Sequence, residues 1–110
     1  MNKRYCFALD LRSDPALIAE YEKYHKNVWP EVLASIRESG IEKMEIFRAG
    51  NRLFMIMETN ANFSLEKKKQ SDEANPVVQK WETLMSKFQQ PLPYATQGEK
   101  WMLMDKIFST

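Results

Sequence analysis

The sequence has one cysteine, one histidine and no apolar run of membrane-spanning length. Cys6 has no second cysteine to pair with and no Cys/His cluster around it, so we expect a buried structural thiol, no internal disulfide and no metal site. Because no apolar run follows the basic N-terminal residues, we expect a soluble, cytoplasmic protein with no membrane partner. Any chemistry that needs a side chain titrating near neutral pH must use His25.

Length and charge restrict the class of protein further. With 110 residues, the chain is expected to form one domain, residues 1–110, around a single core. Its 16 basic and 15 acidic side chains are interspersed and give a net charge of +1, which leaves no basic stripe for nucleic acid. The one basic run, Lys67-Lys68-Lys69, is interpreted as a solvated helix face, and we expect no nucleic-acid partner.

The stretch around His25 carries the strongest functional signal. The Asp-Pro pair at residues 14–15 is typical of a helix start, since the Asp side chain can cap free N–H groups and proline fits the first turn. In that helix Tyr21 lies one turn before His25 on the same side. Pro30 cannot continue the helix, which must break just after His25. The break leaves unpaired backbone groups and room for Trp29 to swing in, as at sites built where an element ends.

His25 and Trp81 each have an ordinary structural interpretation as well. A lone histidine on a half-apolar helix face is more often packed or solvated than catalytic. Trp81 lies midway along a strongly periodic apolar stripe, and such stripes are usually core. Spacing alone leaves both interpretations open.

Hydropathy patterns predict the remaining elements. Residues 3–12 alternate between a bulky apolar side and a second side that contains Ala8, Asp10 and Arg12. We expect this second side to face water, with the floor of a sugar-sized pocket as the alternative. Gly40 is placed to end a helix in the left-handed conformation. The predicted elements are strands 3–12, 43–48, 52–59 and 100–108, helices from 14 to the break, 30–39, 61–73 and from 75 to before Pro91, a tight hairpin at Gly50-Asn51 and a loop at 89–98.

The order of these elements predicts an α+β protein of the ferredoxin-like βαββαβ type, with an antiparallel sheet, as in dimeric α/β barrels. Such a sheet carries its helices on one face. The strand at residues 52–59 is apolar on both sides, so the second face of the sheet must be covered as well. A homodimer that packs sheet against sheet is the expected solution.

Residues around His25 resemble the signature of the L-rhamnose mutarotase family. The match runs through Tyr21-x3-His25, Val28-Trp29-Pro30-Glu31 and Gly40, and continues in the hairpin at residues 46–58 and in Val78-Gln79-Lys80-Trp81. Members of this family are small dimeric ferredoxin-like proteins that interconvert sugar anomers. The resemblance implies that His25 is the proton donor and that Tyr21 and Trp81 bind the sugar.

Two positions depart from the pattern expected of the rhamnose enzymes. Met44 stands where those enzymes are expected to carry a sugar-contacting tyrosine, and Glu82 stands where they carry a second tryptophan beside the first. Losing a hydroxyl donor and an aromatic ring while gaining a carboxylate changes which sugar hydroxyls can be paired. The C-terminal run, residues 88–108, is more similar to family members associated with L-fucose, so both sugars stay open. The predicted substrate-binding residues are Tyr21, Trp81, Met44, Glu82 and Trp29.

Anomer exchange needs one acid and one base, and no cofactor or metal. The predicted function is a sugar mutarotase, an isomerase that interconverts the α and β anomers of a 6-deoxy-L-hexose by general acid/base ring opening. His25 suits the acid, while Glu82, Glu58 or a bound water is left as the base. Two alternatives come from other classes of protein: a non-catalytic dimeric binding module with an adaptable Met- and Trp-rich interior, and a cofactor-free oxygenase on the same fold.

Overall fold

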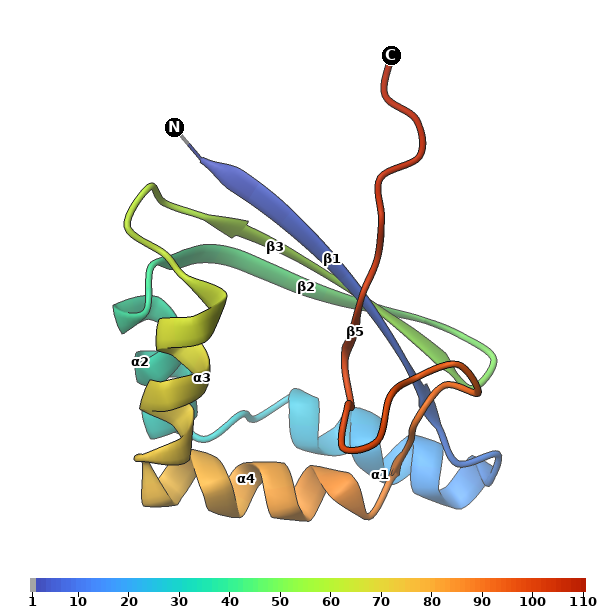
Figure 1. Ribbon diagram of the computed structural model, residues 1–110. Helices are drawn as coiled ribbons and strands as arrows, with labels where there is room; N and C mark the ends of the chain where they lie inside the picture. Colours follow the sequence, from blue (N-terminus) through green and yellow to red (C-terminus); the bar gives the residue numbers. More distant parts are fainter. Residues whose placement is uncertain (1) are drawn as a thin grey trace.

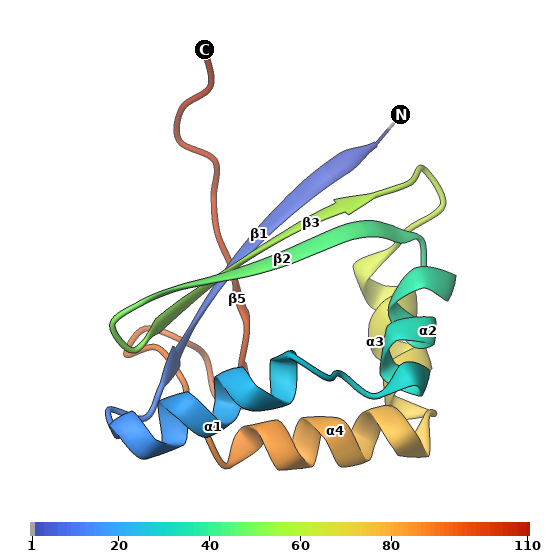
Figure 2. The same cartoon turned by 180° about the vertical axis from the view of Figure 1, so that it is seen from behind.

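The computed structural model describes residues 2–110 and places four helices on one face of an antiparallel sheet (Figures 1 and 2). In both views α1 and α4 lie side by side beneath the sheet, and α2 and α3 lie together at one end. The elements are β1 (Lys3–Leu11), α1 (Pro15–His25), α2 (Pro30–Glu38), β2 (Ile41–Ala49), β3 (Arg52–Thr59), α3 (Leu65–Glu73), α4 (Pro76–Ser86), β4 (Gln89–Gln90) and β5 (Met102–Leu103).

The strand order is β2-β3-β1-β4, with β5 also paired to β1. Every strand pair is antiparallel, and β1 and β3 pair along Lys3 to Asp10. This is the order of ferredoxin-like folds, so the predicted fold class is confirmed. Within the single chain the sheet is open. The hairpin predicted between β2 and β3 is also confirmed, with Gly50 at a φ of +60°.

Two helix starts follow from the sequence as predicted. The Asp14 side chain accepts a hydrogen bond from the Ala16 N–H at 2.9 Å, and the Asn75 side chain accepts one from the Val77 N–H at 3.0 Å. A proline follows each cap at the first helical position, where its missing N–H costs nothing. These caps fix where α1 and α4 begin, and so which of their side chains face the sheet.

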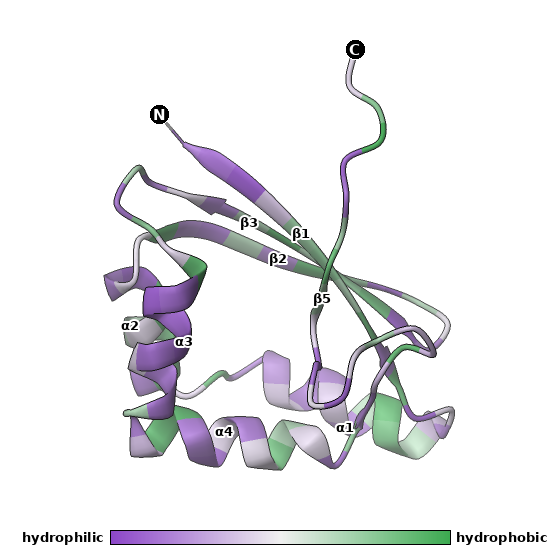
Figure 3. Cartoon of the chain, viewed as in Figure 1, coloured by the Kyte–Doolittle hydropathy of each residue, from purple (hydrophilic) through white to green (hydrophobic). Residues whose placement is uncertain are grey.

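Alternation along the strands gives the sheet an inner and an outer face. The inner face meets the helices and contributes Leu9, Leu11, Leu53, Met55 and Met57 to the core. The outer face has no helix over it (Figures 1 and 3). Its apolar members lie opposite one another in the strand register and are Cys6, Ala8, Phe47, Phe54 and Ile56. Cys6, expected to be buried, is therefore only half-buried.

The last strand differs from its prediction. Residues 89–98 were expected to be loop, but Gln89 and Gln90 pair with the end of β1. Residues 100–108 were expected to be one strand, but only Met102 and Leu103 pair with β1, and the chain then leaves the sheet (Figure 1). The prediction was wrong because alternation indicates an extended backbone, whereas strand pairing depends on which other segment lies alongside.

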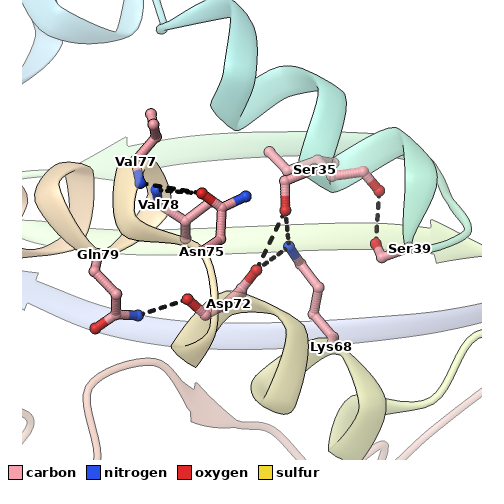
Figure 4. Close-up of polar contacts among 9 residues, drawn as sticks. Ser35, Ser39, Lys68, Asp72, Asn75, Val77, Val78 and Gln79 are labelled. Carbon is pink, nitrogen blue, oxygen red and sulfur yellow. Dashed lines mark hydrogen bonds and ion pairs between the residues drawn. The ribbon is translucent and has the colours of Figure 1, made fainter.

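Polar contacts hold α3 against its neighbours (Figure 4). This helix buries no side chain, as its weak periodicity predicted. Lys68 Nζ lies 2.6 Å from Asp72 Oδ1 and donates to Ser35 Oγ of α2 at 3.2 Å. The Asp72 carbonyl oxygen accepts from the Gln79 side chain of α4 at 2.9 Å. The Lys68–Asp72 pair therefore joins three helices at one end of the space under the sheet.

Gly40 is required by both its backbone conformation and its surroundings. Its φ is +100°, and a Cβ added there would lie 2.6 Å from Asn60 Oδ1. Gly50 has a φ of +60° with nothing within 4 Å of an added Cβ. We expect Gly50→Ala to lower the free energy of unfolding by about 1–2 kcal/mol through left-handed strain alone, and Gly40→Ala to lower it further through the clash. Urea unfolding of both variants is the test, and equal losses would contradict the contribution of Asn60.

Candidate functional site

A cavity of about 760 Å³ lies between the inner face of the sheet and the helices. This volume is in the range of small-molecule sites, and the wall is mostly apolar with a few polar groups, as such sites commonly are. All four helices and strands β2, β3 and β4 contribute to it, together with the segment before β5. Among its lining residues are Tyr21, His25, Ile36, Met44, Met55, Val78, Trp81, Glu82, Gln89 and Trp101.

His25 is the last residue of α1 and is half-buried at the cavity wall. Its Nδ1 lies 2.9 Å from the carbonyl oxygen of Tyr21, one turn earlier. Since a carbonyl oxygen only accepts hydrogen bonds, Nδ1 carries a proton and donates it to that bond. Nε2 has no hydrogen-bond partner within residues 2–110, so this nitrogen is the one free to exchange a proton with a ligand.

The helix ends at His25 for reasons that can be read from the backbone. The N–H groups of Lys26 and Asn27 turn back to the carbonyls of Lys23 and Tyr24, which tightens the last turn. Pro30 then starts α2, and Trp29 before it has an extended ψ of 133°. The break predicted from the proline therefore falls where the sequence placed it, directly after the histidine.

Aromatic rings surround the imidazole. The ring centroids of Tyr21 and His25 are 4.4 Å apart, and the His25 and Trp81 rings meet at a steep angle with centroids 5.6 Å apart. Trp29 packs on Trp81 at 5.2 Å, and Tyr24 does so at 6.4 Å. Trp81 is therefore both a core residue, 8% exposed, and part of the cavity wall. The core interpretation of its spacing is confirmed, and the binding role stays a prediction.

The Tyr21 hydroxyl is kept in its neutral form. Burial raises the pKa of this phenol above its ordinary value, and a hydrogen bond with the Gln89 side chain opposes the rise without cancelling it. At neutral pH the hydroxyl can therefore both donate and accept a hydrogen bond. Gln89 occupies β4, which the sequence treated as loop.

Glu82 is a half-buried carboxylate with one oxygen that has no partner. Its Oε2 is buried and has no hydrogen-bond partner in the described chain, residues 2–110. Burial is the main cause that raises the pKa of Glu82, and repulsion from Asp72 and Glu73 adds to it. Lys100 and Lys68 oppose the rise without reversing it. An unpaired carboxylate oxygen in an apolar wall is unusual and points to a ligand group that would pair with it.

The structure brings five of the six predicted site residues to one cavity: Tyr21, His25, Met44, Trp81 and Glu82. Trp29 is outside the lining and contacts the Trp81 ring. Glu58, one of the two carboxylates considered as a base, lies away from the cavity. It pairs with Arg4 at 3.3 Å, and its side chain is 38% exposed.

Gln89, Lys100 and Trp101 are among the lining residues that sequence reasoning missed. Trp101 packs against both buried clusters of the core, and its alternating position after the loop was the one available signal. Lys100 donates to Ser86 Oγ, and Ser86 in turn donates to the Glu82 carbonyl oxygen at 2.8 Å.

Within residues 2–110 no three His, Cys, Asp or Glu side chains converge as a metal site. None of the described helices combines the length and apolarity that a membrane crossing requires.

Comparison with known proteins gives three findings. The family model described as L-rhamnose mutarotase matches residues 4–110. The chain is similar to an L-fucose mutarotase of Xanthomonas campestris, with 45% identity over 97% of this chain and 87% of that protein, and to an L-rhamnose mutarotase of Phocaeicola vulgatus, with 35% identity over 72% of each. The crystal structure of an L-rhamnose mutarotase from Formosa agariphila has a TM-score of 0.73 at 20% identity, covering 98% of both chains.

The environment of Glu82 predicts how its removal changes stability with pH. Because the pKa of Glu82 is higher in the folded than in the unfolded chain, its protonated form stabilises the fold at low pH. This contribution is lost as the pH rises through the folded-state pKa and the carboxylate ionises. Glu82→Gln, a neutral residue of the same size, is therefore expected to raise the melting temperature at pH 7 and to leave it nearly unchanged near pH 4. Thermal unfolding at both pH values measures this. A variant that is less stable at pH 7 would mean that the carboxylate has a stabilising partner.

Proposed function

This chain belongs to the L-rhamnose mutarotase family, and on that premise we propose that it interconverts the α and β anomers of a 6-deoxy-L-hexose. It is thus an isomerase acting on a monosaccharide. The observation that carries the proposal is the free Nε2 of His25 at the wall of an aromatic-lined cavity, in a chain that the family model matches over residues 4–110.

The residues suit the chemistry of anomer exchange. Opening a pyranose ring requires a proton at the ring oxygen and loss of a proton from the anomeric hydroxyl. The aldehyde then rotates about its bond to C2, and the ring closes on the other face. The His25 imidazolium donates the ring-oxygen proton from Nε2 and takes it back on closure, while the hydrogen bond from Nδ1 to the Tyr21 carbonyl holds the ring in place.

The other wall residues bind the sugar. Trp81 offers a flat apolar surface to the C–H groups of the ring and its 6-methyl, and Met44 adds apolar surface from β2. The neutral Tyr21 hydroxyl pairs with a sugar hydroxyl, as does the Glu82 carboxylate in the cavity wall. Trp29 contributes indirectly, because its contact with the Trp81 ring helps to hold that ring in position.

We place L-fucose ahead of L-rhamnose as the substrate. The relative named for L-fucose shares 45% identity over 97% of this chain, whereas the Phocaeicola relative named for L-rhamnose shares 35% over 72%. The two sugars differ in configuration at C2 and C4, so the cavity side chains that can hydrogen-bond these hydroxyls decide which sugar binds better. Met44 and Glu82 are the two wall positions that depart from the pattern expected of the rhamnose enzymes.

We also propose that two copies of the chain pack through the outer face of the sheet. That face presents Phe47 at 52% exposure, and Met104 beside β5 is 42% exposed. The segment after β5 adds Ile107 and Phe108, which are 95% and 77% exposed on an extended stretch that leaves the sheet (Figure 1). Contiguous apolar surface of this kind marks a protein interface, and a second copy supplies a surface of the same character.

Removing the imidazole tests the function. In His25→Ala the catalysed part of anomer exchange should fall by about a hundred- to ten-thousand-fold, because the acid is lost. Saturation transfer between the anomeric protons of L-fucose and of L-rhamnose measures the rate, with the larger enhancement expected for L-fucose. Asn27→Ala, at an exposed position just beyond the helix end, is the control. Undiminished exchange in His25→Ala would remove His25 from the mechanism, and no exchange by the unmodified protein would favour a binding module.

A charge on the outer face tests the dimer. Phe47→Glu places a carboxylate among apolar side chains of the proposed contact, and because β2 is an edge strand the single chain can tolerate it. The unmodified protein should have twice the mass of one chain by light scattering, and the variant should shift toward one chain. Leu65→Glu, a similar change on α3, should leave the dimer intact. A monomeric unmodified protein would contradict the proposal.

A further inference from the structure

We infer that Glu82 is the general base of this site, the group that takes the proton from the anomeric hydroxyl while His25 protonates the ring oxygen. The inference rests on the proposed function and goes further, because it identifies the second proton-transfer group. Two observations carry it: the buried, unpartnered Oε2 of Glu82, and the position of Glu82 in the same cavity wall as His25.

Three carboxylates line the cavity, and two of them already have partners. Glu42 accepts a hydrogen bond from the Asn2 side chain at 2.7 Å and is exposed at the start of β2. Asp72 is held by Lys68 at 2.6 Å, in the contact that joins α2, α3 and α4 (Figure 4). Glu82 alone among the three has a buried oxygen free of any partner within residues 2–110. Of the three, Glu82 is therefore the carboxylate in the cavity wall that no protein group already holds.

Glu82 is also well placed relative to the acid. It follows Trp81 on α4, and the Trp81 ring lies against the His25 ring, which comes from α1. A sugar in this cavity thus meets an imidazole from one helix and a carboxylate from the other. Both helices are anchored by side-chain caps at their N-termini, which keeps the two groups in a fixed relation.

The surroundings of Glu82 favour a base. Burial and the nearby carboxylates of Asp72 and Glu73 raise its pKa, so the ionised form accepts a proton more readily than an exposed carboxylate does. Lys100 and Lys68 act in the opposite direction and favour the ionised form. Together these groups make the Glu82 carboxylate a stronger proton acceptor than an exposed one, because the causes that raise its pKa outweigh the two lysines.

The proton transfers balance without any other reactant. Glu82 takes the proton of the anomeric hydroxyl, whose oxygen becomes the aldehyde oxygen as the bond from C1 to the ring oxygen breaks. The ring oxygen keeps that electron pair and takes a proton from the His25 imidazolium. After rotation of the aldehyde, His25 takes the proton back as the ring oxygen attacks C1. Glu82 then returns its proton to the new anomeric hydroxyl, so both groups end as they began.

The test separates a base from a hydroxyl-binding group. Glu82→Gln keeps the size of the side chain and an oxygen acceptor but cannot take the proton, so kcat for L-fucose should fall by about a hundredfold or more with little change in KM. The acid-side decline in the pH profile of kcat, which reports ionisation of the base, should disappear in this variant. Glu58→Gln is the matched control, since that carboxylate is outside the cavity and paired with Arg4.

The outcomes are distinct from those that test the function itself. If the unmodified protein exchanges anomers but Glu82→Gln raises KM and keeps kcat, Glu82 only binds a hydroxyl and the inference is overturned while the function stands. If the unmodified protein exchanges neither sugar, the proposed function fails first. Should Glu82→Gln not fold, the pH profile of the unmodified protein decides, because a kcat with no acid-side decline overturns the base.

Discussion

The helix break at Pro30 is the constraint on which the site depends. An unbroken helix would carry the chain past His25 and bury its last turn in regular hydrogen bonds. Because proline excludes this, α1 ends at His25 and α2 sets off in another direction toward the far end of the sheet (Figure 2). The two helices therefore leave a space under the sheet, and the imidazole stands at its wall with one nitrogen anchored to the Tyr21 carbonyl and the other free.

Trp81 packs in the core and also lines the cavity, so its packing is compatible with the sugar-binding role we propose. Its ring contacts Tyr24, His25 and Trp29, and it is buried almost completely, so it counts as core by any measure of burial. The part that remains uncovered faces the cavity. A rigid, fully packed ring is the best support for a sugar, because no side-chain freedom is lost when the sugar binds. The same contacts that stabilise the fold therefore prepare the binding surface.

Features that depend on residues close together in the chain were predictable from the sequence, whereas features that depend on distant residues meeting in the fold were not. Capping by Asp14, the break at Pro30 and the hairpin at Gly50 depend on residues near one another in the chain, and each was read from the sequence. Pairing of Gln89 with β1 depends on a strand nearly eighty residues earlier. The burial of Glu82 likewise depends on the surrounding fold, including residues that follow the loop after α4. The sequence could name Glu82 as a departure from the family pattern, but only the fold reveals that its oxygen is unpaired.

Side chains alternate along the strands, so the residues that line the cavity and those of the proposed dimer contact lie on opposite faces of the sheet. On β3, Met55 points to the cavity while Phe54 and Ile56, its neighbours in sequence, lie on the opposite face. A substitution on the outer face changes the surface that can contact a second protein and leaves the cavity wall unchanged. A substitution on the inner face changes the cavity wall and leaves the outer surface unchanged. Between these faces β1 and β3 are paired along Lys3 to Asp10, so a shift of one strand would move residues of both. The proposed dimer contact and the proposed sugar site thus use different side chains but depend on the same strand register.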